Sequence, residues 1–187
     1  MIIKLSEINT WSNLLSIFRL LMAIPFWFLL DYFEDPTIRL ITFALCLFAS
    51  FTDILDGYLA RKLNEVTEFG KIIDPLADKI AIGVIVIKLF LIGEIPAYYF
   101  WMILLRDVLI FTGGIFITRK IGKVLPSNIL GKITVIIIGI VILLILLNVD
   151  RTSLIFIILY YSSIALIFIS FFGYTIRAFE FIKTGRT

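Results

Sequence analysis

Four aspartates form two closely spaced pairs between Asp53 and Asp78. Residues three or four positions apart share one face of a helix. Asp53 and Asp56 are three positions apart, and Asp74 and Asp78 are four apart, so each pair would share one face. Acidic side chains within an apolar span cost roughly 2.5–3.5 kcal/mol each, and carboxylate oxygens are the ligands that hard divalent cations prefer. The pattern therefore predicts a site for one or two divalent ions between neighbouring helices.

Small residues and one arginine are interleaved with the aspartates. Gly57 and Ala60 follow the first pair, and Gly70 precedes the second pair by about one turn. Side chains this small would open a slot in which a phosphorylated group reaches the backbone, and Arg61 adds a planar cation suited to phosphate. These groups fit phosphoryl transfer, because its catalysis depends largely on positioning and charge neutralisation.

The chain contains no histidine and a single cysteine, Cys46. Without histidine, a Ser-His-Asp triad and the usual zinc sites are excluded. One cysteine excludes an internal disulfide, and its apolar neighbours predict a side chain that packs between helices. Any bound metal is therefore held by oxygen, which favours Mg²⁺, Mn²⁺ or Ca²⁺.

The elements that must position these residues are membrane helices. Hydrophobic residues make up 61% of the 187 residues, and the mean hydropathy is +1.09, whereas soluble domains carry about 45–50% apolar residues. We expect an all-α, polytopic membrane protein with one domain over residues 1–187, in which residues 1–12 could form a short interfacial helix. The six predicted transmembrane helices are Asn13–Leu30, Ile38–Tyr58, Ile73–Leu91, Tyr98–Thr118, Ile129–Leu147 and Ser153–Tyr174.

Basic residues are distributed unevenly between the two predicted membrane faces. The connections on one face carry only Arg39 and Arg151, whereas the other face holds eleven lysines and arginines. Because positive charge concentrates on the cytoplasmic side, both termini and the aspartate-rich loop are predicted to be cytoplasmic. The protein is thus expected in the cell membrane, in contact with the lipid bilayer, and no nucleic-acid partner is predicted.

The aspartate segment resembles a known family signature. It carries the pattern D-x-x-D-G-x-x-A-R-x8-G-x-x-x-D-x-x-x-D without a gap, from Asp53 to Asp78, and this pattern is typical of the CDP-alcohol phosphotransferases. Asn13, Arg19 and Pro25 in the first predicted span are similar to the opening of many members. The six-span layout extends the resemblance over nearly the whole chain.

This resemblance implies a membrane enzyme that moves a phosphatidyl group from CDP-diacylglycerol to a second alcohol and releases CMP. It implies that Asp78 accepts the proton of the attacking hydroxyl, and that the protein is a homodimer. It assigns a pair of Mg²⁺ or Mn²⁺ ions to Asp53, Asp56, Asp74 and Asp78. It assigns the nucleotide pocket to Asp56, Gly57, Ala60, Arg61 and Gly70.

The acceptor alcohol remains open between three classes. Glycerol 3-phosphate is favoured, because the segments around Arg106 and Lys132 resemble phosphatidylglycerophosphate synthases. Phosphatidylglycerol, the acceptor of cardiolipin synthases, and inositol phosphate or another polyol are the alternatives. Candidate acceptor-binding residues are Arg106, Lys132, Arg119 and Arg177. Arg106 could instead form a structural ion pair with Asp107 or with a motif aspartate, and Lys132 could simply extend to the membrane surface.

A small cation-dependent transporter is the alternative from another functional class. Intramembrane carboxylates are typical of ion pathways, and the transporter hypothesis therefore accounts for the four aspartates. It does not account for Gly57, Ala60, Arg61 and Gly70 at fixed distances from them. The sequence therefore favours an enzyme.

Overall fold

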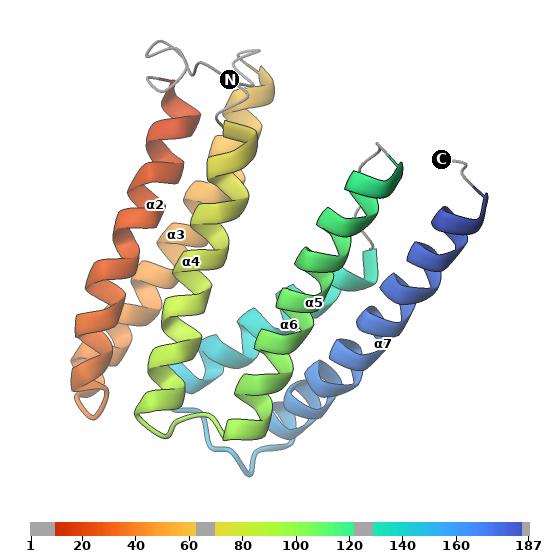
Figure 1. Cartoon of the computed structure of the whole chain (residues 1–187). Coiled ribbons are helices and arrows are strands. Elements are labelled where there is room, and N and C mark those ends of the chain that lie inside the picture. Colours follow the sequence, from red (N-terminus) through yellow and green to blue (C-terminus); the bar gives the residue numbers. More distant parts are fainter. Residues whose placement is uncertain (1–9, 63–69, 122–128, 185–187) are drawn as a thin grey trace. The chain divides into compact units, whose positions relative to one another are not determined.

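Six long α-helices make up nearly all of the described chain, which comprises residues 10–62, 70–121 and 129–184 of this computed structural model (Figure 1). No strand occurs within these ranges, so the predicted all-α fold is confirmed. The predicted interfacial helix lies largely outside the described residues. The helices are α2 (Trp11–Leu29), α3 (Pro36–Lys62), α4 (Gly70–Leu91), α5 (Ala97–Ile121), α6 (Ile129–Leu146) and α7 (Leu154–Thr184), with a 3₁₀ turn η1 (Leu30–Tyr32) after α2.

All of these helices except α4 are long and apolar enough to span a membrane. Their outer surfaces carry large apolar side chains, such as Ile54, Ile129 and Leu154, which are exposed. Such surfaces require lipid as their solvent, and the chain is therefore a multi-pass membrane protein. The 22 residues of α4 match a span in length, but they include five charged residues: Lys71, Asp74, Asp78, Lys79 and Lys88.

The helices divide into two compact units, residues 1–94 and residues 95–187. In the first unit, α2 packs against both α3 and α4. Its apolar contacts centre on Phe26, Leu30 and Leu89, which are almost completely buried. Toward the start of α2, the inner face becomes polar, with Asn13 and Ser16 buried as well. The first unit therefore contains an apolar region and a polar region along one helix.

The turn between α2 and α3 is specified locally. The Asp35 carboxylate accepts hydrogen bonds from the backbone N–H groups of Thr37 and Ile38, at 2.7 and 3.4 Å. Asp35 thus acts as the N-cap of α3, and Pro36 occupies the first helical position, where its missing N–H costs nothing. This arrangement fixes where α3 starts, and with it the helix positions of the aspartates near its other end.

In the second unit, α7 packs against both α5 and α6. Val141 of α6 and Ile167 of α7 are buried in its apolar core. The buried hydroxyls of Tyr99 and Ser163 are hydrogen-bonded at 2.8 Å. Together these contacts place the polar residues of α5 against α7. The prediction of one domain over the whole chain stays a prediction.

Two helix ends use the same backbone device. After α4, Gly93 has a φ of +83°, and the N–H of Glu94 donates to the carbonyl of Leu89 at 2.9 Å. After α6, Asn148 has a φ of +52°, and the N–H of Val149 donates to the carbonyl of Leu144 at 3.0 Å. This left-handed cap satisfies carbonyls that the helix leaves without partners. Glycine and asparagine are the residues that adopt it most readily.

Candidate active site

Two of the four motif aspartates meet at one arginine within the first unit. Nη1 of Arg19, on α2, lies 2.7 Å from Oδ1 of Asp53 on α3. The same Nη1 donates to Oδ1 of Asp78 on α4. Arg19 is only 3% exposed, whereas the side chains of Asp53 and Asp78 are 44% and 38% exposed. The structure thus places two predicted metal ligands, from different helices, on a single buried cation.

Buried small residues and one buried threonine lie near these aspartates along α3 and α4. Thr52, next to Asp53, is buried and donates its hydroxyl to the carbonyl of Ala49 at 2.8 Å. Ala77, next to Asp78, is completely buried, and Gly70 is buried at the start of α4. Side chains of this size allow helices to approach closely. This local sequence therefore permits carboxylates of α3 and α4 to reach the same guanidinium group.

The other motif residues lie on helical backbone, but their side chains are outside the described residues. This holds for Asp74 on α4 and for four positions on α3: Asp56, Gly57, Ala60 and Arg61. Among the described side chains, no group of three or more acidic, cysteine or histidine residues could hold a metal. The described donors are thus half of the predicted ligand set, and their oxygen chemistry suits Mg²⁺ or Mn²⁺.

Arg106 is the central polar residue of the second unit. It is buried on α5, and its Nη1 lies 2.6 Å from Oδ1 of the neighbouring Asp107. Nη2 donates to the carbonyl of Gly131 on α6 at 3.3 Å, and Nε donates to Oγ of Ser170 on α7 at 3.4 Å. Arg106 thus connects all three helices of this unit, and Asp107 is the ion-pair partner that the structure gives it.

The remaining acceptor candidates are distributed over the second unit. Lys132 is exposed in the first turn of α6 and follows Gly131, whose carbonyl accepts the hydrogen bond from Arg106. The structure therefore brings Lys132 and Arg106 to the same turn of α6. Arg177 is exposed on α7, about two turns beyond Ser170. The side chain of Arg119 lies outside the described residues.

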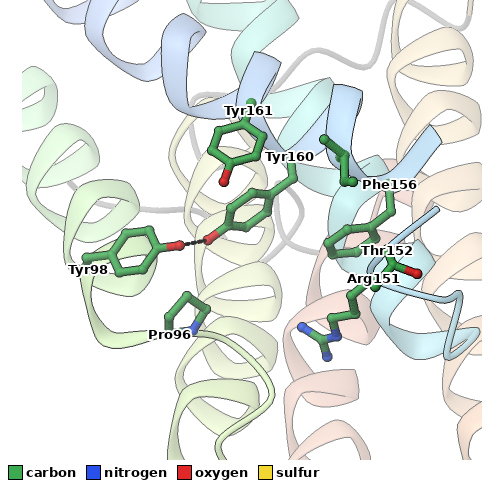
Figure 2. A pocket seen from close by; sticks show the side chains of 8 residues that line it. Pro96, Tyr98, Arg151, Thr152, Phe156, Tyr160 and Tyr161 are labelled. Atoms are coloured by element: carbon green, nitrogen blue, oxygen red, sulfur yellow. Dashed lines mark hydrogen bonds between the residues drawn. The ribbon is translucent and has the colours of Figure 1, made fainter. Parts of the chain in front are cut away.

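A cavity of about 430 Å³ lies elsewhere in the second unit (Figure 2). The Tyr160 hydroxyl donates to that of Tyr98 at 2.7 Å, and the Arg151 guanidinium carbon lies 5.6 Å from the centre of the Phe156 ring. None of the residues predicted to form the active site lines this cavity. Its lining comprises Pro96, Tyr98, Arg151, Thr152, Phe156, Ile157, Tyr160 and Tyr161.

Sequence reasoning assigned no chemical role to three residues of these clusters. Arg19 was part of the first-span pattern, and its signal was an arginine inside an apolar helix, which is costly unless it is paired. Ser170 and Gly131 had no comparable signal, because serine and glycine are frequent in membrane helices for packing alone. Their contacts with Arg106 are between residues far apart in the sequence.

The long apolar helices define a polytopic membrane protein. Within its units, carboxylates and buried arginines are in contact. The family model described as CDP-alcohol phosphatidyltransferase matches residues 9–173. The chain belongs to this family, and the resemblance carried by the aspartate motif is confirmed.

Several relatives share the same activity in their names, CDP-diacylglycerol–glycerol-3-phosphate 3-phosphatidyltransferase. The protein from Bacillus subtilis is 40% identical over 123 residues, which are 64% of this chain and 63% of that protein. The protein from Aquifex aeolicus is 35% identical over 176 residues, which are 91% of this chain and 96% of that protein. The protein from Rickettsia bellii is 41% identical over 98 residues, 52% of this chain and 54% of that protein. The match thus spans just over half of the Rickettsia relative and nearly all of the Aquifex relative.

Proposed function

We propose that this protein transfers a phosphatidyl group from CDP-diacylglycerol to glycerol 3-phosphate and releases CMP. The observation that carries the proposal is the convergence of Asp53 and Asp78, from α3 and α4, on Arg19. It brings together the first and last carboxylates of the family motif. The names of the relatives support the reaction and favour glycerol 3-phosphate as the acceptor.

The site is proposed to hold two Mg²⁺ or Mn²⁺ ions. Bound there, such ions would neutralise the pyrophosphate of CDP-diacylglycerol and so lower the barrier to displacement. The ligands are Asp53, Asp56, Asp74 and Asp78. The nucleotide pocket is proposed to comprise Asp56, Gly57, Ala60, Arg61 and Gly70. In that pocket, the small residues admit the phosphates close to the backbone, and Arg61 pairs with phosphate oxygen.

Asp78 is the proposed proton acceptor. The acceptor hydroxyl oxygen forms a bond to the phosphorus that carries diacylglycerol, the bond from this phosphorus to CMP breaks, and the hydroxyl proton passes to Asp78. A carboxylate among cations is a weak base, so proton transfer must be coupled to the attack. Asp78 therefore has to lie within hydrogen-bond reach of the incoming hydroxyl, which its partial exposure allows.

The phosphate of the acceptor is proposed to bind the cations of the second unit. Lys132 is best placed for this role, because it is exposed in the first turn of α6, where the helix dipole also favours an anion. Arg106 orders the same turn through the Gly131 carbonyl. Arg119 and Arg177 are proposed to add positive charge to this acceptor site.

The protein is proposed to be a homodimer of the cell membrane, with both termini and the active site facing the cytoplasm. The uneven distribution of lysine and arginine supports this orientation. The dimer rests on the family resemblance alone.

The orientation is tested by labelling single cysteines introduced near residues 64 and 148 with a reagent that does not cross membranes. Only the cysteine near residue 148 should react in intact cells.

The proposed reaction is tested by CMP release from CDP-diacylglycerol in detergent micelles containing Mg²⁺. Glycerol 3-phosphate, phosphatidylglycerol and inositol phosphate are supplied in parallel. Turnover with glycerol 3-phosphate alone is expected, and it should stop with EDTA and return with Mg²⁺ or Mn²⁺. Turnover with either of the other acceptors instead would reassign the family branch. A folded protein that releases no CMP with any of the three acceptors would refute the proposed reaction.

A further inference from the structure

Arg19 bears a charge in a place where charge is costly. It lies within the membrane-spanning segment Asn13–Tyr32 and is almost completely buried. An arginine at such a position is retained when it pairs with acidic groups or serves a function. Its partners are Asp53 and Asp78, both of which belong to the proposed metal site. Arg19 therefore belongs to the electrostatics of that site, although the family motif between Asp53 and Asp78 does not include it.

The contact joins three helices through one nitrogen atom. Nη1 of Arg19 on α2 touches Oδ1 of Asp53 on α3 and Oδ1 of Asp78 on α4. Two carboxylates held this close would repel each other in the absence of a cation. The guanidinium group removes that repulsion and fixes the distance between the two helices. A carboxylate has two oxygens and about four lone-pair positions, so binding Arg19 does not exhaust its capacity for a cation.

We propose that Arg19 is a positioning residue of the metal site, an inference that rests on the proposed function. It acts as a built-in counter-ion that holds Asp53 and Asp78 together in the metal-free protein. Because Arg19 and a divalent ion are both cations bound by the same carboxylates, each weakens the binding of the other. The arginine thus keeps the site assembled at the expense of metal affinity, which favours exchange of the ion.

A counter-ion and a purely structural ion pair predict different changes in metal affinity when the arginine is lost. Loss of a structural pair lowers stability and leaves metal binding unchanged or weaker. Loss of Arg19 should lower the stability of the metal-free protein but tighten metal binding. The pair of Lys88 with Asp31 is a matched control in the same unit. It also joins a buried cation to a half-exposed aspartate, but neither residue belongs to the motif.

The experiment compares the wild-type protein with Arg19→Gln, Arg19→Lys and Lys88→Met. Mn²⁺ binding is measured by the loss of the free-ion signal in electron paramagnetic resonance, and thermal unfolding in detergent is measured with and without MnCl₂. Arg19→Gln should bind Mn²⁺ on the order of tenfold more tightly, within the usual range for coupled sites. Its melting temperature should be lower without metal and should rise more on adding metal than that of the wild type.

The two other variants separate charge from fold. Arg19→Lys keeps the positive charge, so its Mn²⁺ affinity should stay near that of the wild type. Lys88→Met should melt earlier, but with the same rise on adding metal as the wild type. If Arg19→Gln folds only when Mn²⁺ is present, the counter-ion role is supported in the same way, because the ion then replaces the missing cation.

Three results would overturn the proposal. The first is Mn²⁺ binding by Arg19→Gln that is unchanged or weaker than in the wild type. The second is an Arg19→Lys protein that binds Mn²⁺ as tightly as a tightened Arg19→Gln protein. The third is failure of Arg19→Gln to fold even with Mn²⁺. The proposed function fails separately. A wild-type protein that neither binds Mn²⁺ nor releases CMP would refute the metal chemistry, and the role of Arg19 with it. A wild type active with metal alongside any of the three results would refute only the role of Arg19.

Discussion

Lys88 on α4 and Asp31 in η1, the turn after α2, form an ion pair of 2.5 Å, in which the lysine is buried and the carboxylate half-exposed. The ammonium group also lies 4.5 Å from the centre of the Trp27 ring, within range of a cation–π contact. The contact of Arg19 with Asp78 joins α4 to α2, and the pair of Lys88 with Asp31 joins α4 to η1. Those contacts offset the cost of burying α4, which is the helix too charged to count as an apolar span among those that the structure describes.

Replacing Lys88 by methionine tests how much this pair contributes. Methionine keeps the apolar stem but removes the charge, and Asp31 remains partly in contact with solvent. We therefore expect a loss of about 1–2 kcal/mol in unfolding free energy, between the values for surface pairs and for fully buried pairs. Thermal unfolding in detergent measures the change, and CMP release per folded molecule should stay at the wild-type level. A loss of turnover without a loss of stability would contradict a purely structural role for Lys88.

Asp78→Asn is the sharpest test of the proposed base. The amide keeps the size of the side chain but cannot accept the proton, and general-base groups contribute typically 10²–10⁴-fold. We expect CMP release to fall by at least about 100-fold, while the protein remains folded because Arg19 keeps Asp53 as a partner.

The matched control for this change is Asp31→Asn, the same substitution in the same unit away from the motif. It should lower stability slightly and leave turnover intact. Unimpaired turnover by Asp78→Asn would refute its role as base. Equal losses in both variants would show that the loss reflects folding of the unit instead of chemistry.

Lys132 and Arg106 should respond differently to loss of charge. Lys132 is exposed, so Lys132→Gln should raise the KM for glycerol 3-phosphate by about 10-fold or more without a change in melting temperature, as expected when a charged contact to phosphate is lost. Arg106 contacts Asp107, Gly131 and Ser170, so Arg106→Gln should lower stability as well. Initial rates at varied acceptor and varied CDP-diacylglycerol check both variants. Equal effects on the KM of the two substrates would argue against an acceptor site at Lys132.

Local patterns in the sequence predicted most of the fold. Long apolar runs predicted the six helices. Five of these are also apolar enough to span a membrane, whereas α4 carries five charged residues and does not meet that criterion. The spacing of Asp53 and Asp78 within the motif indicated that carboxylates of two helices meet. The partner of these carboxylates was beyond prediction, because Arg19 reaches them through packing of α2 against α3 and α4. The same holds for Arg106, whose contacts on α6 and α7 depend on how helices distant in sequence pack.

Glycines that look alike in the sequence differ in what surrounds them. A Cβ at Gly114 on α5 would lie 3.0 Å from the hydroxyl of Tyr174 on α7, and a Cβ at Gly131 would lie 3.3 Å from Nη2 of Arg106. A Cβ at Gly139 on α6 would meet no atom within 4 Å in the described part of the chain. Glycine thus permits close contact at the first two positions and serves no such purpose at the third.

Alanine substitutions at these positions should therefore have opposite signs. Gly139→Ala should stabilise the protein by up to about 1 kcal/mol, because alanine is the better helix former. Gly114→Ala should destabilise it by about 1 kcal/mol, since the Tyr174 hydroxyl has to move away from the new Cβ, which costs more than the better helix propensity of alanine gains. Gly131→Ala should displace the Arg106 guanidinium and weaken its hydrogen bond to the Gly131 carbonyl, at a cost of about 1 kcal/mol. Thermal unfolding in detergent ranks the three variants, and a Gly114→Ala protein as stable as Gly139→Ala would contradict the close contact of α5 with α7 at Tyr174.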